Sequence, residues 1–257
     1  MRQNLSDNLL PIGHLVETGV LADRRARWWG AFMGDRLCAL TLCVGRTDEG
    51  WAAATPAGDP DGTLAIGEAL RGVRFELILA PREAADALWI GLGRPAPRVW
   101  SDHLLAVCER VSPGPRLDLR RARLDELDAV VHMAAELERE DLGVDPRLEE
   151  PELHREQVAA RVQAGCVWLG EREGRVVFKG DVGLHCPHGA LIGSLWVDPG
   201  VRGQGLGAAG TRALCDRLLA QTPRVGLHVG EGNRPARAAY RKAGFEERAP
   251  FRLFLAR

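Results

Sequence analysis

The sequence predicts an α/β (α+β) protein built from two similar domains in tandem, each a mixed, mostly antiparallel twisted sheet flanked by helices. Apolar runs and turn residues give both halves one order of elements: three strands, a helix, a strand, a helix and a strand. This order repeats after about 120 residues, although the halves share little sequence identity. Between them, residues 111–116 (VSPGPR) contain two prolines and a glycine, which disfavour helix and strand alike. We therefore expect domains over residues 1–112 and 117–257.

The first half is expected to begin with a short helix over residues 5–19, broken near Pro11. Apolar runs over 27–34 and 36–45 flank Gly34-Asp35 and predict a hairpin. Pro81 suits the first turn of a helix, so a helix is expected to start there. The other expected elements are a strand over 50–55, a helix over 62–70, a strand over 75–80, the helix over 81–92, and strand-like segments at Val99 and over 103–108.

The second half is expected to start with a strand over 117–122, followed by a helix with apolar residues at helical spacing from Leu124 to Leu137. A loop is expected from Asp141 to Pro151. The remaining expected elements are a helix over 152–164, antiparallel strands over 166–170, 176–184 and 190–197, a helix over 205–220, a strand over 225–229, a helix over 235–243, and strands over 246–248 and 251–256.

Composition excludes several classes of protein. The net charge of −1 implies no general attraction to nucleic acid or to a membrane surface. No apolar run reaches the roughly 18 residues that a membrane helix needs. The six cysteines form no C-x-x-C pair and mostly lie in apolar runs, and no signal peptide follows Met1, so we expect a reducing cytoplasm.

A glycine-rich loop joins a strand to a helix in the second half. The apolar run from Ala190 to Val197 ends at the turn Asp198-Pro199-Gly200, and RGQGLG (202–207) leads into the helix. Glycine lets the backbone approach a ligand closely, and the first amides of a helix have no partner inside it. The helix dipole and a nearby arginine, Arg202, add positive charge. The pattern therefore predicts a site for a pyrophosphate.

Residues 205–210 also match the dinucleotide-binding pattern G-x-G-x-x-G, and Glu231 follows at the spacing of a ribose-binding acid. We reject that interpretation for two reasons. The first glycine should follow its strand almost at once, but here a turn and Arg202 lie between them. Only one further strand–helix unit follows, which is too little for a doubly wound sheet.

Residues 117–257 resemble the GCN5-related N-acetyltransferases (GNAT). The acetyl-CoA loop of that family reads [Q/R]-x-x-G-x-[G/A] after a strand that ends V-x-P, which is matched here by VDP (197–199) and by Arg202, Gly205 and Gly207. A second family motif is similar to NRPARAAY (233–240) followed by Gly244-Phe245. The two motifs stand in the right order and about 30 residues apart.

The resemblance implies acetyl-CoA as co-substrate, no metal, and direct transfer to an amine. It implies that the strand end pairs with the pantetheine amides through the backbone of Leu195, Trp196 and Val197. It also implies a place near the cofactor for Arg202 and Asn233, and pyrophosphate binding by the amides of Gly203, Gln204, Gly205, Leu206, Gly207 and Ala208.

Tyr240 is the only tyrosine of the chain, and it follows Asn233 by seven residues on the helix of the second motif. Its phenol, with a usual pKa of about 10, suits a donor that protonates the departing coenzyme A thiolate. The alternative is a half-buried aromatic whose hydroxyl bonds to the backbone. Asn233 has an alternative role as well, because asparagine is a good N-cap for the helix that follows it.

The sequence does not identify the general base. The central strand 190–197 has no carboxylate, so the candidates are Glu138, Glu140, Asp141 and His185, and a water chain is a further option. Residues 185–188 (HCPH) look like part of a zinc site, but no second ligand pair follows, and a hairpin turn accounts for them better.

Residues 136–152 contain eight acids and two arginines. In the family this segment lines the acceptor side, so an acidic lip favours a cationic amine, either a small molecule or a peptide. An ordinary exposed face is the alternative. A monomer or a homodimer is expected, with no nucleic-acid or membrane partner.

The first half lacks the cofactor pattern at the matching place. Residues 55–62 (TPAGDPDG) have neither the arginine nor G-x-G, and Asp59 and Asp61 would repel a phosphate. We expect a GNAT-like domain without a cofactor loop, or simply another α/β domain. Two other functions stay open for the whole chain: a non-catalytic acetyl-CoA sensor or interaction module, and an acyltransferase with another acyl group or acceptor.

Overall fold

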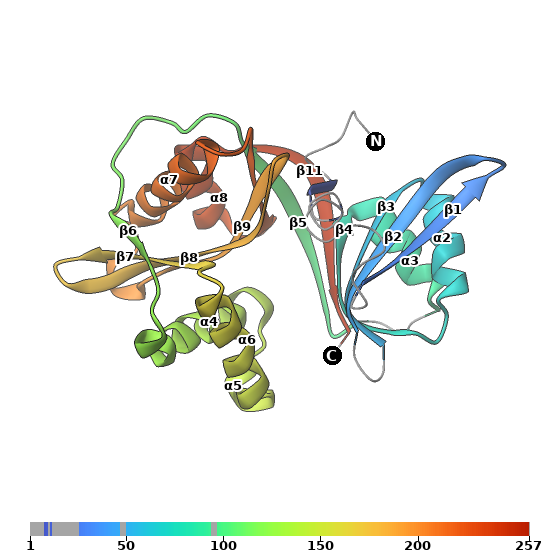
Figure 1. Ribbon diagram of the computed structural model, residues 1–257, viewed down its shortest axis with the longest axis horizontal. Helices are drawn as coiled ribbons and strands as arrows, with labels where there is room; N and C mark the ends of the chain where they lie inside the picture. Colours follow the sequence, from blue (N-terminus) through green and yellow to red (C-terminus); the bar gives the residue numbers. More distant parts are fainter. Residues whose placement is uncertain (1–7, 10, 12–25, 47–49, 94–96, 257) are drawn as a thin grey trace. The chain divides into compact units, whose positions relative to one another are not determined.

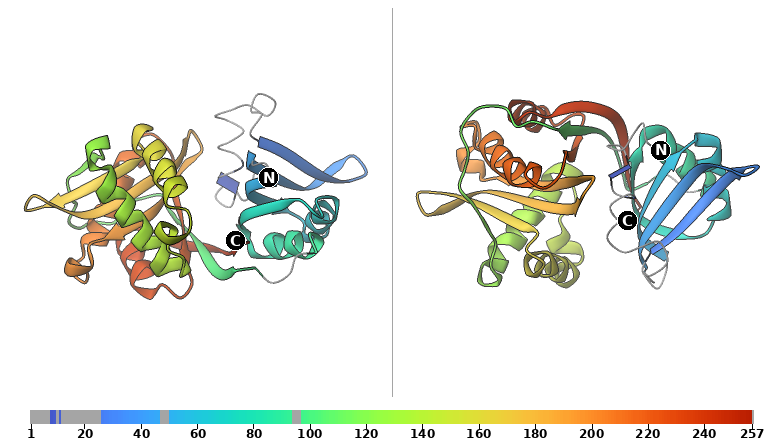
Figure 2. Two further views of the ribbon diagram at one scale, coloured as in Figure 1. Left: turned by 90° about the horizontal axis from the view of Figure 1, so that it is seen from below. Right: turned by 45° about the horizontal axis from the view of Figure 1, so that its top comes forward.

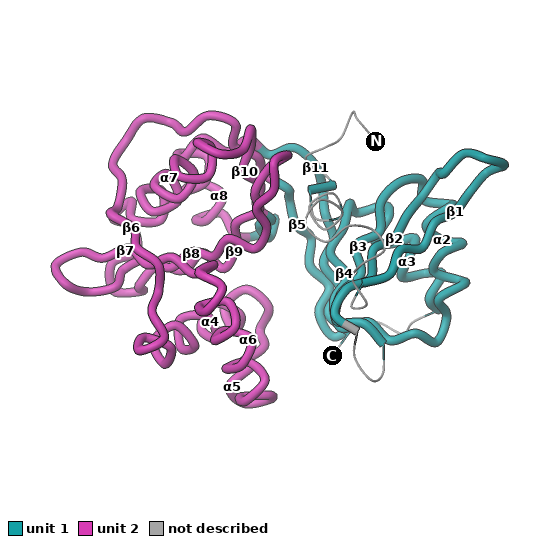
Figure 3. The backbone as a smooth tube through the Cα atoms, in the orientation of Figure 1, with its two compact units in different colours: residues 1–105, 228–232, 247–257 teal, residues 106–227, 233–246 magenta. Residues whose placement is uncertain are grey.

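The computed structural model describes residues 8–9, 11, 26–46, 50–93 and 97–256 (Figure 1). The helix expected over 5–19 therefore lies almost wholly outside the described residues. The chain forms two compact units, which we call unit 1 (residues 1–105, 228–232 and 247–257) and unit 2 (106–227 and 233–246) (Figure 3). These units divide the chain at other places than the expected boundary, so the domains 1–112 and 117–257 remain a prediction.

All eleven described strands belong to one mixed sheet, in the order β1-β2-β3-β4-β11-β5-β10-β9-β8-β7-β6. The fold is mixed α/β, as expected, but the two separate sheets of the prediction are one. Three strands, β5, β10 and β11, have residues in both units. Among the described residues, no helix is both long and apolar enough to cross a bilayer.

Unit 1 contains the expected hairpin. β1 and β2 pair antiparallel around a tight turn, where Gly34 has a positive φ of 59°. β3 pairs antiparallel with β2 and parallel with β4. The elements are β1 (Ala26–Met33), β2 (Arg36–Arg46), β3 (Gly50–Gly58), α2 (Pro60–Ala69), β4 (Arg74–Pro81), α3 (Arg82–Gly91) and β5 (Val99–Cys108).

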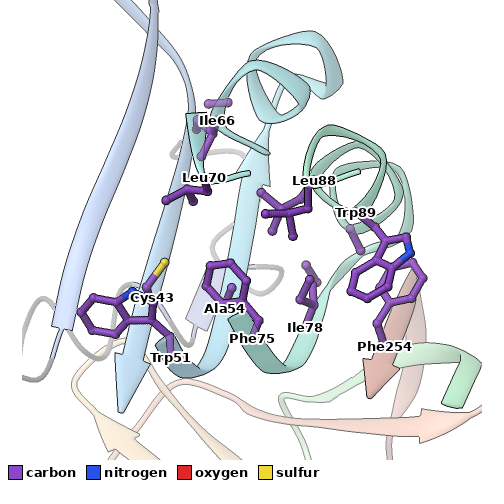
Figure 4. Packing of buried hydrophobic residues seen from close by; sticks show 14 residues of the cluster. Cys43, Trp51, Ala54, Ile66, Leu70, Phe75, Ile78, Leu88, Trp89 and Phe254 are labelled. Atoms are coloured by element: carbon purple, nitrogen blue, oxygen red, sulfur yellow. The ribbon is translucent and has the colours of Figure 1, made fainter. Parts of the chain in front are cut away.

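Helices α2 and α3 cover one face of the unit 1 sheet (Figure 2). Ile66 and Leu70 from α2 and Leu88 from α3 point toward sheet residues such as Ile78 (Figure 4). Their burial explains the helical spacing of apolar residues in the sequence, because that spacing places them on one side of each helix.

Unit 2 follows the predicted order closely. β7, β8 and β9 pair antiparallel, and β9 pairs parallel with β10. The elements of the second half of the chain are β6 (Leu119–Arg121), the 3-10 turn η3 (Leu124–Glu126), α4 (Leu127–Leu142), α5 (Pro146–Glu149), α6 (Pro151–Gln163), β7 (Val167–Arg172), β8 (Arg175–Cys186), β9 (Gly189–Val197), η4 (Pro199–Val201), α7 (Leu206–Leu219), β10 (Val225–Gly230), α8 (Arg234–Ala243) and β11 (Glu246–Leu255), of which β11 lies almost entirely in unit 1.

Helices cover both faces of the unit 2 strands, with α7 and α8 on one face and α4 to α6 on the other (Figures 1 and 2). On the α7 face the sheet and helix touch closely, since a Cβ on Gly210 would lie 2.5 Å from the Phe178 ring. On the other face Trp196 of β9 packs with apolar residues of α4 and α6, such as Val130 and Val158.

Two details of the prediction for the second half are wrong. The segment expected as a loop from Asp141 to Pro151 contains the short helix α5, whose amide at Arg147 is capped by the Asp145 carboxylate. The two strands expected at the C-terminus are one continuous strand, β11, which runs through Pro250.

The last strand, β11, pairs antiparallel with β4 of the first half, from Phe251 opposite Pro81 to Leu255 opposite Leu77. Phe254 stacks on Trp89 of α3, with ring centroids 5.0 Å apart and planes 9° from parallel (Figure 4). The C-terminal strand of the second half thus completes the core of unit 1. This is why the compact units are not continuous stretches of chain.

Candidate active site

The mouth of α7 is built from glycines with left-handed backbone. Gly203 and Gly205 have φ of 82° and 80°, a region that side chains rarely adopt. A Cβ at either position would meet nothing within 4 Å, so open space lies in front of the loop. Gly203 and Gly205 are therefore needed for the left-handed backbone of the loop and keep the loop open to a ligand. Close packing does not require glycine at either position.

The first amides of α7 have no acceptor within the helix. Ala209 is the first donor, bonding to Gly205 O at 3.0 Å, so the amides of Leu206, Gly207 and Ala208 precede the helical pattern. Gly205 is the N-cap and has no side chain to cover them. Within the described residues, no backbone carbonyl outside α7 bonds to these amides. They form the positive end of the helix dipole and suit an anion.

Arg202 holds the loop against its surroundings. Its Nε donates to Val197 O at 3.1 Å, and its Nη2 lies 2.9 Å from Glu140 Oε2 on α4. The predicted charge is thus beside the loop, but it is paired with a carboxylate. Arg202 therefore ties the end of β9 to α4 in this state. Gln204 is held too, because its Oε1 accepts from Arg172 at 2.9 Å.

Strand β9 separates from β10 where the site begins. The two strands pair only at Ala190 and Leu191, opposite Val225 and Gly226, so the second half of β9 has no partner on that side within the described residues. On the other side the β8 register shifts, and Ser194 and Leu195 together face Gly180. This is a β-bulge, which bends a strand and increases its twist.

A cavity of about 390 Å³ opens between the end of β9, the α7 loop and α8. Its wall contains ten of the eleven predicted cofactor residues: Leu195, Trp196, Val197, Arg202, Gly203, Gly205, Leu206, Gly207, Ala208 and Asn233. Tyr240 also lines it. Gln204 alone among the predicted site residues does not.

Asn233 is the N-cap of α8, as the alternative interpretation expected. Its Oδ1 accepts from Ala236 N at 3.2 Å, and its Nδ2 donates to Asp141 Oδ1 at 3.3 Å. Capping fixes the start of the helix that carries Tyr240, so Asn233 has a structural role at the cavity wall whether or not it also touches a ligand.

Tyr240 lies at the cavity wall with its ring against Phe245, at a centroid distance of 6.0 Å. Burial, and to a smaller extent the carboxylate of Asp141, raise the pKa of Tyr240 well above the usual tyrosine value. A phenol in this setting keeps its proton at neutral pH, so Tyr240 is available as an O–H donor.

Only two of the four predicted base candidates, Glu140 and Asp141, line the cavity. Glu138 faces the opposite direction, with Oε1 3.8 Å from Nδ1 of the buried His154, and burial raises the pKa of Glu138. His185 is exposed on β8 beside the hairpin turn that residues 187–188 form, as expected for HCPH. No group of three metal-binding side chains occurs among the described residues.

Part of the acidic segment 136–152 is paired with the chain's own basic side chains. Glu136 pairs with His132, Glu140 with Arg202, and Asp145 with Arg147 at 2.7 Å. Arg147 lowers the pKa of Asp145 to about 2. These pairs support the alternative of an ordinary exposed face more than an acidic lip.

Sequence reasoning missed the apolar wall of the cavity. This wall, with two polar residues beside it, comes from the five elements α4, β8, η4, α7 and α8: Leu137, Phe178, Val201, Thr211, Pro235, Ala236, Ala238, Ala239 and Lys242. A helical spacing signal was present for α8, because residues 235, 236, 239 and 240 share one side of a helix. Phe178 gave no signal, since it looks like any core residue of a strand.

Comparison with protein families gives one match. The sequence model of the Acetyltransferase (GNAT) family matches residues 131–245. This range contains the bulged strand, the α7 loop and α8, and therefore every residue of the cavity wall. Among curated proteins, none matches the chain in sequence.

Several solved structures share the fold over nearly the whole chain. An "Acetyltransferase from GNAT family from Colwellia psychrerythraea" is 14% identical, with a TM-score of 0.56 and coverage of 98% of this chain and 97% of that one. A "GCN5-related N-acetyltransferase from Kribbella flavida" is 17% identical, with a TM-score of 0.55 and 90% of each chain covered. A "Tandem GNAT protein from the clavulanic acid biosynthesis pathway" is 16% identical, with a TM-score of 0.51, covering 97% of this chain and 88% of that one.

Proposed function

Because residues 131–245 form a domain of the GNAT acetyltransferase family, we propose that the chain transfers an acetyl group from acetyl-CoA directly to a primary amine. The observation that carries this proposal is the cavity of unit 2, which connects the amides at the mouth of α7 with the unpaired half of β9. Both parts suit the two ends of one long ligand, an anionic pyrophosphate and a chain with peptide-like groups.

The residues present fit coenzyme A. The open amides of Leu206, Gly207 and Ala208, with Gly203 and Gly205 giving access, support pyrophosphate binding. The backbone of Leu195 to Val197 supports pairing with pantetheine amides in the manner of an added strand. In this proposal Arg202 shapes the loop through Val197 O and Glu140, and Gln204 acts through its backbone.

Acetyl-CoA supplies the activated acetyl group as a thioester when it is bound. The chain's own groups orient it beside the amine, which makes the reaction effectively intramolecular. A C–N bond forms and the C–S bond breaks. The amine nitrogen gives up a proton to Asp141 on the cavity wall or to water, and the leaving sulfur takes a proton. We assign that proton to the Tyr240 hydroxyl, which is protonated and lies on the cavity wall.

The first half serves, in this proposal, as a GNAT-like domain without a cofactor site. Support comes from the matching element order and from the fold shared with a protein described as a tandem GNAT protein. A monomer or homodimer, a cytoplasmic location and an amine acceptor that is a small molecule or a peptide are part of the proposal.

The test combines calorimetric titration with acetyl-CoA and a thiol-release assay over a panel of amines, peptides, aminoglycosides and alcohols. We expect micromolar binding and release of coenzyme A that depends on an amine. Binding without release on any acceptor would instead support a sensor, and release only with longer acyl thioesters would support another acyltransferase. Binding of NADH without acetyl-CoA binding would contradict the proposal altogether.

A further inference from the structure

The bulge in β9 is held in an unusual backbone conformation. Ser194 has a φ of 49°, and among the described residues only Glu173 is another non-glycine with positive φ. A bulge of this type usually has glycine at the left-handed position, because a Cβ is strained there. Ser194 comes immediately before Leu195, the first residue of the unpaired strand end that lines the cavity.

A buried lysine contacts this strained residue. Lys179 on β8 is 1% exposed, and its Nζ donates to Ser194 O at 3.2 Å. The chain has only two lysines, Lys179 and Lys242, among 34 basic residues. The compact ammonium of lysine donates in several directions, whereas the planar guanidinium of arginine needs more room. In a chain that otherwise uses arginine, a lysine therefore occurs where a buried donor has little room.

The lysine is anchored by a buried carboxylate. Asp181, 2% exposed, places Oδ1 2.8 Å from Lys179 Nζ and Oδ2 2.5 Å from Arg161 Nη2 on α6. Burying an ammonium is unfavourable unless it is paired and hydrogen-bonded. An apolar residue would fill this core position at less risk, so the charge pair points to a task beyond filling space.

We propose that Lys179 and Asp181 are positioning residues that lock the left-handed turn at Ser194, and so direct the backbone of Leu195 to Val197 toward the cavity. Without the bond to Ser194 O, the strained φ would relax toward the extended region. The bulge would then shift, and β9 would lose the bend that separates it from β10.

This inference rests on the proposed function, because it assigns the strand end to acetyl-CoA. Neither Lys179 nor Asp181 lines the cavity, so both act through Ser194 and touch no substrate. A strain lock makes a specific prediction: glycine at position 194, which adopts positive φ freely, removes the need for the lysine.

The experiment compares acetyl-CoA affinity by calorimetry for the wild type, Lys179→Met, Ser194→Gly and the double variant. We expect Lys179→Met to raise Kd about tenfold, the effect of losing a charge-assisted hydrogen bond. In the Ser194→Gly background the same change should raise Kd less than about threefold, because the two sites are coupled. The melting temperature is followed in parallel.

Glu173→Gly is the matched control. It removes the other positive-φ side chain, in the β7–β8 turn, and tests whether general relief of backbone strain restores binding. We expect Lys179→Met with Glu173→Gly to bind as weakly as Lys179→Met alone. Equal rescue by both glycines would overturn the lock, and so would a tenfold loss that persists with Ser194→Gly.

Two further outcomes are distinguishable. A wild-type protein that does not bind acetyl-CoA refutes the proposed function, whereas binding that is unchanged in Lys179→Met refutes only the lock. If Lys179→Met does not fold, Ser194→Val tests the same left-handed turn by changing the residue in the turn and keeping the lysine. A β-branched residue resists positive φ, so we expect weaker binding although Lys179 is present, and unchanged binding would contradict the inference.

Discussion

The two strand–helix junctions, β3 to α2 and β9 to α7, stand at the same place in the element order but treat the helix amides in opposite ways. At α2 the Asp59 carboxylate accepts from Asp61 N at 3.0 Å and from Gly62 N at 3.3 Å. At α7 the N-cap is Gly205, which has no side chain, and the first amides face open space. One helix is capped by its own chain, and the other is available to a ligand.

The strands before these helices both leave their parallel neighbour before they end, but β9 leaves it earlier. β3 pairs in parallel with β4 from Gly50 to Ala54, whereas β9 pairs with β10 only at Ala190 and Leu191. Gly58, at the end of β3, lies so close to β2 that a Cβ would sit 2.5 Å from Cys38 O, but Gly205 has nothing within 4 Å. Glycine serves close packing at the first junction and access at the second.

The two halves share an order of elements but not the features of the proposed cofactor site. That site would use an uncapped helix start together with a strand that leaves its neighbour, and of the two junctions only the second combines them. The comparison leads to four predictions, which follow from the largest expected effect to the smallest.

The first prediction tests whether the two halves of the sequence are separate folding units. Phe254→Ala removes the ring that stacks on Trp89, and we expect a loss of about 3–5 kcal/mol in the free energy of unfolding. Chemical denaturation measures it. Phe32→Ala is the control, because Phe32 is 65% exposed and should change stability little. Equal effects at both positions would contradict the role of β11 in the core of unit 1.

The second prediction concerns Tyr240, which has no counterpart in α3 of the first half. Tyr240→Phe keeps the ring and removes the proton donor, so we expect kcat to fall about 100-fold with little change in the KM for acetyl-CoA. Steady-state thiol release measures both. An unchanged kcat would remove Tyr240 from the mechanism.

The same residue predicts a pH profile. Because burial and Asp141 raise the pKa of Tyr240, its protonated form persists above the usual tyrosine pKa of about 10. The wild-type rate should therefore show no decline from tyrosine ionisation between pH 8 and about pH 10. A decline in that window that Tyr240→Phe abolishes would contradict the raised pKa.

The third prediction makes the second junction less open. Gly205→Val puts a branched side chain at φ 80°, and we expect the KM for acetyl-CoA to rise about tenfold or more through strain and obstruction. Gly72→Val is the control, since Gly72 has φ 89° and equally open surroundings in unit 1. It should lower stability similarly and leave KM unchanged. A KM that stays constant in Gly205→Val would exclude the pyrophosphate role.

The fourth prediction concerns the β3–α2 junction, where the first helix amides lose their side-chain cap. Asp59→Ala removes the cap of α2, and we expect a loss of about 1 kcal/mol in stability. The KM for acetyl-CoA should not change, because the first junction does not serve the cofactor. Thermal unfolding and the thiol-release assay together measure this, and a raised KM would show that the first junction takes part in binding.

The sequence predicted local features well, because they depend on residues close together in the chain. Positive φ at Gly203 and Gly205, the N-cap at Asn233 and the hairpin around Gly34 all follow from residue type and spacing. The glycine loop lines the cavity of unit 2, and its role in binding pyrophosphate stays a prediction.

Long-range features were beyond the sequence. The pairing of β11 with β4 joins residues about 170 positions apart, and an apolar strand such as RLFL fits many edges equally well. The bulge at Ser194 gave no signal either, since serine does not mark a left-handed position. Lys179 gave no signal of its burial, because lysine is mostly exposed in proteins, and here it is 1% exposed.

The most direct test of the account follows backbone amides by ¹H–¹⁵N spectroscopy while coenzyme A is added. The account predicts large shifts for the amides of Leu206, Gly207 and Ala208, and none for Asp61 and Gly62, whose amides Asp59 already caps. Pantetheine, which lacks the pyrophosphate, should leave all five nearly unchanged. Equal shifts at both junctions, or none at Leu206 to Ala208 with coenzyme A bound, would contradict it.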